Sequence, residues 1–153
     1  MKKTTKVLLI LSVLLAVFVY IIAMKSVRGH DSLYNNELGY TVTLGMKKTK
    51  VDKMLGEPTK TGDGYSYDSL IVDYEDGAVV SMFAMEKHWY TKNMICVDMY
   101  VDDFTAADGT PAYTDEFNRD YGYFYSSANG RRYYVGYFIR NTENQITFIK
   151  IAY

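Results

Sequence analysis

A single unbroken apolar segment, from Val7 to Met24, stands near the start of the chain. As a helix this segment would be about 27 Å long, close to the thickness of the hydrocarbon core of a bilayer. Three lysines precede it, namely Lys2, Lys3 and Lys6. Because lysines favour the cytoplasmic side, we expect residues 1–6 to be a cytoplasmic tail and residues 7–24 to be a transmembrane anchor in the lipid bilayer.

A cleaved signal peptide is the alternative interpretation of this segment. Its apolar core is long for a signal peptide, and the small residues near Ala23 and Gly29 match a cleavage site poorly. In either case the rest of the chain is exported. We expect the polar residues 25–39 to form a linker and residues 40–153 to form an extracytoplasmic domain, held at the cell membrane by a single pass.

Apolar and polar residues alternate in several later stretches, which is typical of half-buried strands. One predicted strand covers residues 65–74, and two more, at residues 123–125 and 132–140, flank a turn near Asn129 and Gly130. The cleanest alternation lies between residues 95 and 102. One face there is apolar (Ile95, Val97, Met99 and Val101), and the opposite face consists of Cys96, Asp98, Tyr100 and Asp102.

A pattern of two apolar residues four positions apart, followed by glycine, occurs twice. Val51, Leu55 and Gly56 match Phe117, Tyr121 and Gly122. The spacing predicts two short helices, at about residues 47–55 and 113–121, each ending at a glycine. On this basis we expect Val51→Asp or Phe117→Asp to unfold the domain.

The match continues downstream, where residues 77–82 correspond to residues 144–149. Gly77 and Asn144 are both suited to positive φ, so each is expected to close a turn before a strand. One helix with three strands cannot bury its own apolar face, but two such units side by side can. We therefore predict an α+β fold in which two helix-plus-three-strand repeats form one antiparallel sheet. Both helices would lie on one face, and the opposite face would stay partly open to solvent.

The first repeat resembles a known superfamily. The string from Leu44 to Pro58, with Gly45-Met46 and Leu55-Gly56, is similar to the helix signature of the BamE/SmpA-like and beta-lactamase-inhibitor-protein-like superfamily. The second repeat, from Tyr121 to Gly136, resembles the domain that accompanies CAP-type secreted proteins of Gram-positive bacteria. One departure is Lys47, which stands where the superfamily has a capping hydroxyl, so the first helix needs another cap.

The superfamily resemblance implies an exported, non-enzymatic module that binds proteins. Inhibitory members present a concave sheet face to an enzyme, and envelope members scaffold larger assemblies. The shared motif is structural, so it assigns no functional residue to this chain.

The composition of the chain further restricts the classes of function to consider. The net charge of −1 disfavours a nucleic-acid partner. The chain is rich in aromatic residues, with 16 Tyr and 7 Phe. Tyrosine on strands supplies a large contact area at low entropic cost, which is typical of binding surfaces. The candidate partner-binding residues are Tyr65, Tyr67, Trp89, Tyr100, Tyr123, Tyr125, Tyr133 and Tyr137. For each tyrosine the alternative is a half-buried strand residue whose hydroxyl reaches water.

Catalytic, metal and cofactor motifs are missing from the sequence. The acidic residues before Gly77 and Gly109 do not have EF-hand spacing, and the two histidines and Cys96 lie in separate regions. We therefore expect no catalytic residue, no metal and no cofactor. The leading hypothesis is a protein-binding module for another exported or envelope protein, either a scaffold or an inhibitor or immunity protein. A small-ligand or cell-wall-glycan binder is the alternative, and a hydrolase ranks third.

Overall fold

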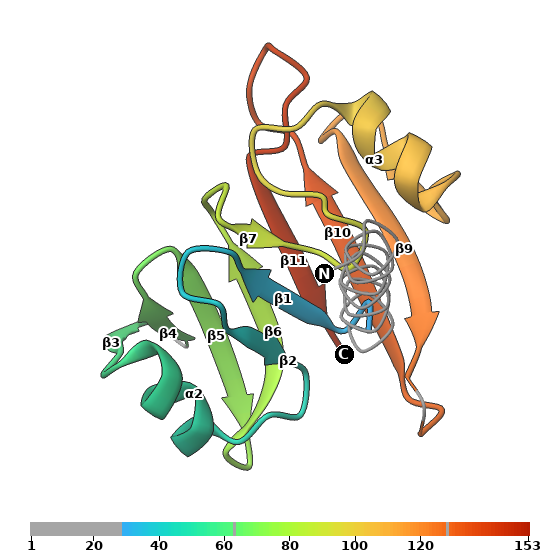
Figure 1. Ribbon diagram of the computed structural model, residues 1–153. Coiled ribbons are helices and arrows are strands. Elements are labelled where there is room, and N and C mark those ends of the chain that lie inside the picture. Colours follow the sequence, from blue (N-terminus) through green and yellow to red (C-terminus); the bar gives the residue numbers. More distant parts are fainter. Residues whose placement is uncertain (1–28, 63, 128) are drawn as a thin grey trace, which may run out of the picture.

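The chain folds into two antiparallel sheets and two short helices (Figure 1). The computed structural model describes residues 29–62, 64–127 and 129–153, so the predicted tail and anchor lie outside the described residues. Within these described ranges, no helix combines the length and apolar character needed to cross a bilayer. The predicted α+β class, with two short helices and antiparallel strands, is confirmed.

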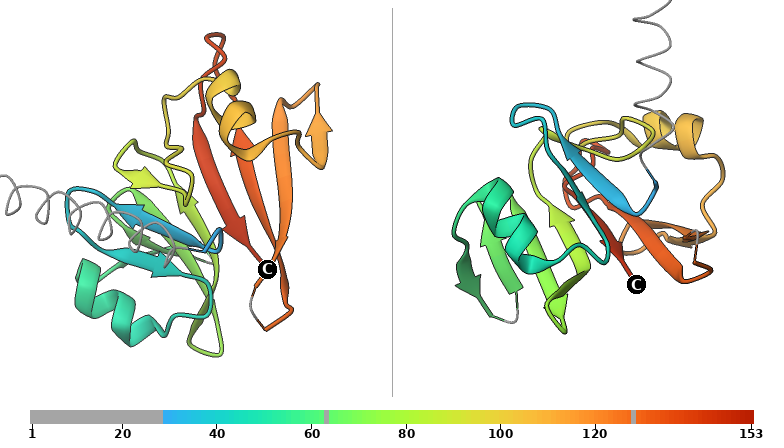
Figure 2. Two further views of the ribbon diagram at one scale, coloured as in Figure 1. Left: turned by 45° about the vertical axis from the view of Figure 1, so that its right-hand side comes forward. Right: turned by 60° about the horizontal axis from the view of Figure 1, so that its bottom comes forward.

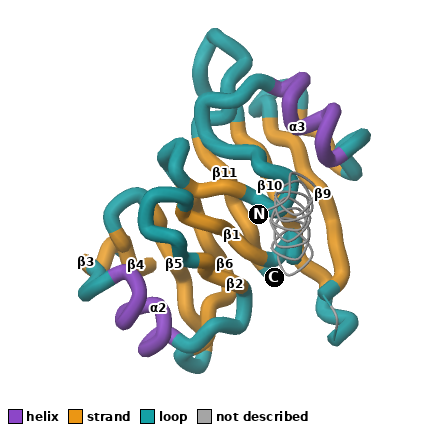
Figure 3. Tube along the Cα trace, in the orientation of Figure 1, coloured by secondary structure: helices purple, strands orange, loops and turns teal. Residues whose placement is uncertain are grey.

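Eight strands form the large sheet, in the order β3-β4-β5-β6-β11-β10-β9-β8. In chain order they are β3 (Thr59–Thr61), β4 (Gly64–Tyr67), β5 (Leu70–Glu75), β6 (Ala78–Ala84), β8 (Tyr113–Asp115), β9 (Asp120–Ser126), β10 (Arg132–Phe138) and β11 (Phe148–Ala152). The small sheet has the order β2-β1-β7, with β1 (Ser32–Asn35), β2 (Thr41–Thr43) and β7 (Trp89–Tyr90). The helices are α2 (Lys48–Leu55) and α3 (Val101–Asp108), and Figure 3 shows them at opposite ends of the strand-rich body.

The large sheet consists of two copies of one unit, joined where β6 pairs with β11. The first copy contains α2 and β3 to β6, and the second contains α3 and β8 to β11. Each helix begins with the same backbone hydrogen bond. The Lys48 N–H donates to the Gly77 carbonyl at 2.8 Å, and the Val101 N–H donates to the Asn144 carbonyl at 3.2 Å. Gly77 and Asn144 have φ of 73° and 62°, so the two predicted turns are equivalent.

These turns also explain how α2 begins without a capping side chain. Lys47 makes no side-chain hydrogen bond to the helix. The Gly77 carbonyl, which comes from the turn before β6, satisfies the first helical N–H instead. Each helix ends at a glycine of positive φ, with Gly56 at 87° and Gly109 at 81°. Such glycines reverse the chain without a steric penalty.

The predicted second helix at residues 113–121 is wrong. Residues 113–115 form the edge strand β8, and Asp120 begins β9. Between them the Asp115 carboxylate accepts hydrogen bonds from the backbone N–H groups of Phe117 and Asn118, which is the geometry of an Asx turn. Phe117 is 95% exposed and takes no part in the core.

Two predicted strands and the linker boundary also differ from the structure. The alternating segment 95–102 is a loop that leads into α3, because Asp98 takes φ of 71° and the helix begins at Val101. The predicted strand 65–74 is a hairpin, because Asp68 at φ 57° reverses the chain between β4 and β5. Residues 32–35, predicted as linker, form β1, and Leu33 is fully buried.

The core lies on one side of the large sheet, called here the covered face. The helices and the small sheet lie over this face, and no described element covers the opposite side (Figure 2). Val51 of α2 and Phe104 of α3 occupy the same position in their helices and are both fully buried. Leu33, Val42 and Trp89 of the small sheet belong to the same core cluster.

Candidate functional site

Most of the tyrosines predicted to bind a partner do share one face of the sheet, but it is the covered face. Strand register places Tyr125 opposite Tyr133 and Tyr123 opposite Val135, with all four side chains toward the helices and the small sheet. Four of the predicted tyrosines are buried, namely Tyr67, Tyr123, Tyr133 and Tyr137. Tyr65 and Tyr125 are half-buried, and Tyr100 stands apart at the start of α3.

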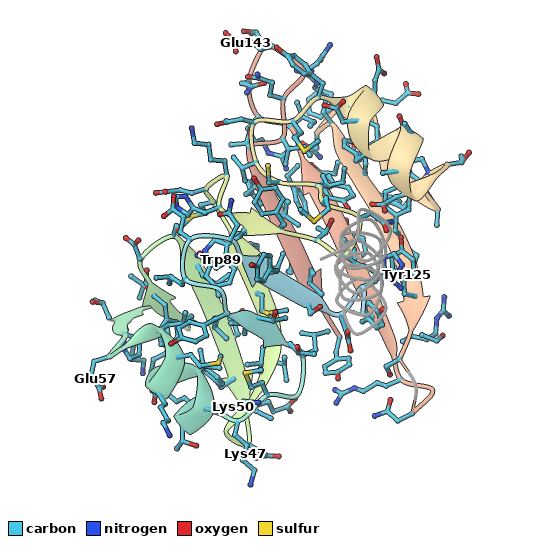
Figure 4. The ribbon with its side chains drawn as sticks, viewed as in Figure 1. Lys47, Lys50, Glu57, Trp89, Tyr125 and Glu143 are labelled. Atoms are coloured by element: carbon cyan, nitrogen blue, oxygen red, sulfur yellow. The ribbon has the colours of Figure 1, made fainter. Side chains whose placement is uncertain are left out.

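Polar partners inside the core satisfy several of these side chains. The Trp89 indole N–H donates to the Ser69 hydroxyl at 3.1 Å, and Trp89 is only 1% exposed, at the centre of the molecule (Figure 4). The Tyr123 hydroxyl donates to the Gly109 carbonyl at 2.8 Å. Burial raises the pKa of Tyr125 and of Tyr133 to about 12. These side chains therefore fix the helices and the small sheet to the large sheet, and the buried ones present no surface to a partner.

The open side of the large sheet carries a different set of aromatic residues, called here the aromatic face. These residues come from β6, β9, β10 and β11, and three cationic side chains lie among them. The aromatic members are Phe83, Phe124, Tyr134, Phe138 and Phe148, and the cations are Arg132, Arg140 and Lys150. Phe124 is 51% exposed, and the other four aromatic residues are half-buried although no described element lies over them.

A row of phenylalanines crosses the junction between the two copies. The Phe138 and Phe148 rings stack with centroids 4.4 Å apart, and the Phe83 centroid lies 6.2 Å from that of Phe148. The Lys150 ammonium lies 4.7 Å from the Phe83 ring centroid. The Arg140 guanidinium lies 5.5 Å from the Phe138 ring and forms an ion pair with Asp120 at 2.5 Å. The row is therefore an apolar strip bordered by cations at cation–π distance.

The ring of Tyr134 lies flat against the sheet beside this row of phenylalanines. Gly122 and Gly136 are directly opposite one another in β9 and β10, and the ring of Tyr134 leans along the sheet across both. A Cβ added at either glycine would come within 2.4 Å of a ring carbon of Tyr134. The two glycines therefore make the space in which the ring lies against the backbone. Burial raises the pKa of the Tyr134 hydroxyl above its usual value.

The aromatic face has the composition of a binding surface. Aromatic and arginine side chains are the residue types enriched where proteins bind one another. Across the described residues, no group of three or more His, Cys, Asp or Glu side chains is placed to hold a metal ion. Cys96 is buried, and burial raises the pKa of its thiol, which disfavours the reactive thiolate.

The alternation of side chains along the strands groups the residues of the aromatic face on one side of the sheet. It does not indicate that this side is the uncovered one. Phe124 and Tyr134 alternate in the sequence with the tyrosines Tyr123, Tyr125 and Tyr133, which lie on the other side of the same strands and are equally aromatic. The available signal was Gly136, two positions after Tyr134 in the same strand, together with Gly122. Glycines within strands mark places where another group approaches the backbone closely.

Comparison with known proteins adds one structural relative. No family model matches the chain, and no curated protein matches its sequence. The fold is similar to the 1.5 Å crystal structure of an extracellular protein containing an SCP domain from Bacillus anthracis str. Ames, with a TM-score of 0.50 and 8% identity. The match covers 71% of this chain and 43% of that one, so this chain spans less than half of its relative.

This similarity concerns the fold alone, because the identity is so low. It agrees with the second of the two sequence resemblances, the one to the domain that accompanies CAP-type secreted proteins. The described residues thus form a domain like that of an extracellular bacterial protein.

Proposed function

We propose that this chain is a non-enzymatic module, anchored in the membrane and exposed outside it, whose aromatic face binds another exported or envelope protein. The observation that carries this proposal is the uncovered strip of Phe83, Phe138 and Phe148 with its bordering cations. Apolar side chains gathered on a bare sheet face, rather than scattered singly, are typical of an interaction site. The extracellular origin of the structurally similar protein and the apolar segment 7–24 support the exported location.

The route of the chain supports the choice of the aromatic face over the covered face. The His30 ring stacks on Tyr125 with centroids 3.9 Å apart, so the described chain begins against the covered face. An anchor that precedes residue 29 would therefore approach that side of the sheet. The aromatic face lies on the opposite side and would point away from the membrane, where an exported partner is accessible.

Photo-crosslinking in the native membrane tests this proposal. A benzophenone side chain at position 124 samples the aromatic face, and one at position 117 samples an exposed phenylalanine outside it. We expect a discrete protein adduct from position 124 and none of the same mass from position 117. In a background with Phe148→Ser, which opens the aromatic row, the yield from position 124 should fall by about tenfold, because central aromatic side chains contribute most of the binding energy.

Thermal unfolding of the Phe148→Ser variant provides the control for folding. The proposal fails if adducts from positions 124 and 117 are the same, or if the yield is unchanged in a folded Phe148→Ser variant. A protein adduct that arises only from residues of the covered face would also contradict it.

The flat ring of Tyr134 favours one alternative, a binder of cell-wall glycan. A tyrosine ring held against paired glycines presents a planar surface on which a sugar ring can stack. Sedimentation with isolated cell wall discriminates between the two functions. A glycan binder would co-sediment with protein-free wall and lose this property in Tyr134→Ala but keep it in Tyr134→Phe. A protein-binding module would remain in the supernatant in all three forms.

A further inference from the structure

A second surface, on the opposite side of the molecule, has its own chemistry. A cleft of about 660 Å³ opens beside the start of the described chain. Its lining includes His30, Lys50, Lys92, Ser126 and Ser127, together with one carboxylate, that of Asp31. Burial and the nearby charge of Lys92 hold the pKa of His30 below its usual value, so the positive charge of the cleft at neutral pH comes from its two lysines. Lysines beside hydroxyl groups match the oxygens of a phosphate.

The lysines of α2 extend this positive surface. Lys47, Lys50 and Lys53 are exposed, and Lys47 and Lys50 lie at the N-terminal end of the helix (Figure 4). Among residues 29–62, 64–127 and 129–153, none of these three lysines has a carboxylate within ion-pair distance; only Lys48 of this helix does, with Asp52 at 2.8 Å. Cations at a helix N-terminus oppose the helix dipole, so Lys47 and Lys50 do not serve the stability of α2, whereas Lys53 lies in the last turn, where a cation is favourable.

Exposed apolar residues lie on the same side of the molecule. Leu38 is 55% exposed and Tyr40 is 42% exposed, both at the turn between β1 and β2. Figure 2 shows this turn, α2 and the start of the described chain together on the side of the covered face. Lysines combined with a few exposed apolar and aromatic side chains are the composition of a surface that lies against anionic lipid.

We propose that this side of the domain docks on the anionic headgroups of the bilayer that holds the anchor, through Lys47, Lys50 and Lys92 with Leu38 and Tyr40. The inference rests on the membrane-anchored placement proposed above. Only residues 25–28 separate the predicted anchor from Gly29, and a fully extended chain across that interval spans at most about 18 Å. The cleft and α2 are therefore close enough to the bilayer to contact its phosphates, and the aromatic face is turned outward.

Fluorescence quenching in nanodiscs tests this docking on the full chain. A fluorophore is attached at Thr49→Cys on α2, or at the matched exposed position Thr59→Cys on β3, in a Cys96→Ala background. The nanodiscs contain phosphatidylcholine alone or with about 30% phosphatidylglycerol, and a headgroup spin label acts as quencher. We expect phosphatidylglycerol to double the quenching at position 49 and to leave position 59 unchanged.

Charge reversal supplies the decisive comparison. Lys47→Glu, Lys50→Glu and Lys92→Glu together should abolish the effect of phosphatidylglycerol at position 49, and about 0.5 M NaCl should do the same in the unsubstituted chain. Soluble phosphate at constant ionic strength should not displace the domain, because the headgroups are held at the surface. Equal quenching in both lipids, an unchanged response after charge reversal, or displacement by soluble phosphate would each overturn the inference.

The same samples separate this inference from the proposed function. If the full chain is retained in nanodiscs and crosslinks through position 124 but shows no dependence on phosphatidylglycerol, only the docking inference fails. If the chain is not retained in nanodiscs, the membrane-anchored placement fails, and the docking inference fails with it.

Discussion

The two copies of the unit hold their helices against the same sheet with different buried anchors, although a tyrosine hydroxyl of the sheet donates to a helix aspartate in both. These bonds run from Tyr67 to Asp52 and from Tyr137 to Asp108. In the first copy the buried anchor of α2 is aliphatic, Val51, and a polar network accompanies it. The Asp52 carboxylate accepts hydrogen bonds from Lys48 at 2.8 Å and from the Tyr67 hydroxyl at 2.5 Å. In the second copy the anchor of α3 is Phe104, which stacks on Tyr137 with ring centroids 4.6 Å apart. The same backbone arrangement thus accommodates an aliphatic buried side chain in one helix and an aromatic one in the other.

The outer surfaces of the copies differ as well. In the first copy the open side carries mainly small or polar residues, such as Ser66, Asp73 and Ser81, with Ile71 beside Phe83 as an apolar exception. In the second copy it carries most of the aromatic face, and Phe83 of β6 extends that face across the junction. The repeat thus supplies the scaffold, while the proposed binding surface belongs mainly to one copy.

The largest expected effect comes from removing the two helix anchors. Phe104→Ala should lower the free energy of unfolding by about 3–5 kcal/mol, because it leaves a large cavity among aromatic rings. Val51→Ala removes less apolar volume and should cost about 1.5–3 kcal/mol. Chemical denaturation of the two variants measures this difference.

Phe117→Ala serves as the matched control, because this phenylalanine is 95% exposed, and it should change stability by less than about 0.5 kcal/mol. A cost at Phe117 equal to that at Phe104 would restore the predicted helix at residues 113–121 and refute the assignment of α3 to the repeat.

An intermediate effect is expected from the polar network of the first copy. Burial alone would raise the pKa of Asp52, but hydrogen bonds from Lys48 and Tyr67 outweigh burial and hold the pKa below its usual value. The folded state thus binds this proton less readily than the unfolded chain. The stability that Asp52 supplies is complete above its unfolded pKa of about 3.9 and is lost as the pH falls below it.

Asp52→Asn should therefore cost about 1–3 kcal/mol at pH 7 and flatten the acid side of the stability profile. Denaturation midpoints between about pH 6 and 3 provide the measurement. A variant whose loss of stability is the same at both ends of that range would show that the network contributes packing and no pH dependence. Tyr67→Phe, which removes only the hydroxyl, separates the hydrogen bond from the ring.

The smallest effect concerns the flat tyrosine of the aromatic face. Alanine normally improves on glycine within a strand by about 0.5–1 kcal/mol. Gly136→Ala should instead destabilise the domain by about 1 kcal/mol, because the new methyl group meets the ring of Tyr134. In a Tyr134→Ala background the sign should reverse. A double-mutant cycle with no coupling between positions 134 and 136 would mean that the ring does not lie over the glycines in solution.

Much of the fold was predictable from the sequence, because the turn residues determine where helices and strands begin and end. Gly77 and Asn144 were identified as equivalent turns, and both have positive φ. The second helix was missed because the spacing of Phe117, Tyr121 and Gly122 imitates the first helix. The correct match was also present, since Met46, Val51 and Gly56 have the same spacing as Met99, Phe104 and Gly109.

The site was harder to predict than the fold. Alternation along β9 and β10 identifies which residues share a face, but it does not tell which face the rest of the chain covers. Because both faces of these strands are aromatic, hydrophobicity did not separate Tyr133 from Tyr134. Of the covering elements, β1 lies in the predicted linker, and α3 begins at the end of the predicted strand 95–102, so the side on which they pack was not predictable.

The position of β11 has a consequence for how the domain reaches its folded state. Residues 148–152 form the final strand of the chain order yet occupy the middle of the large sheet, between β6 and β10. Pairing within either copy therefore cannot complete the sheet until this strand is in place. Without it, β6 carries an unsatisfied edge beside buried side chains, a hazard for aggregation. Insertion of β11, rather than collapse of either half, is then the event that commits this domain to its native state.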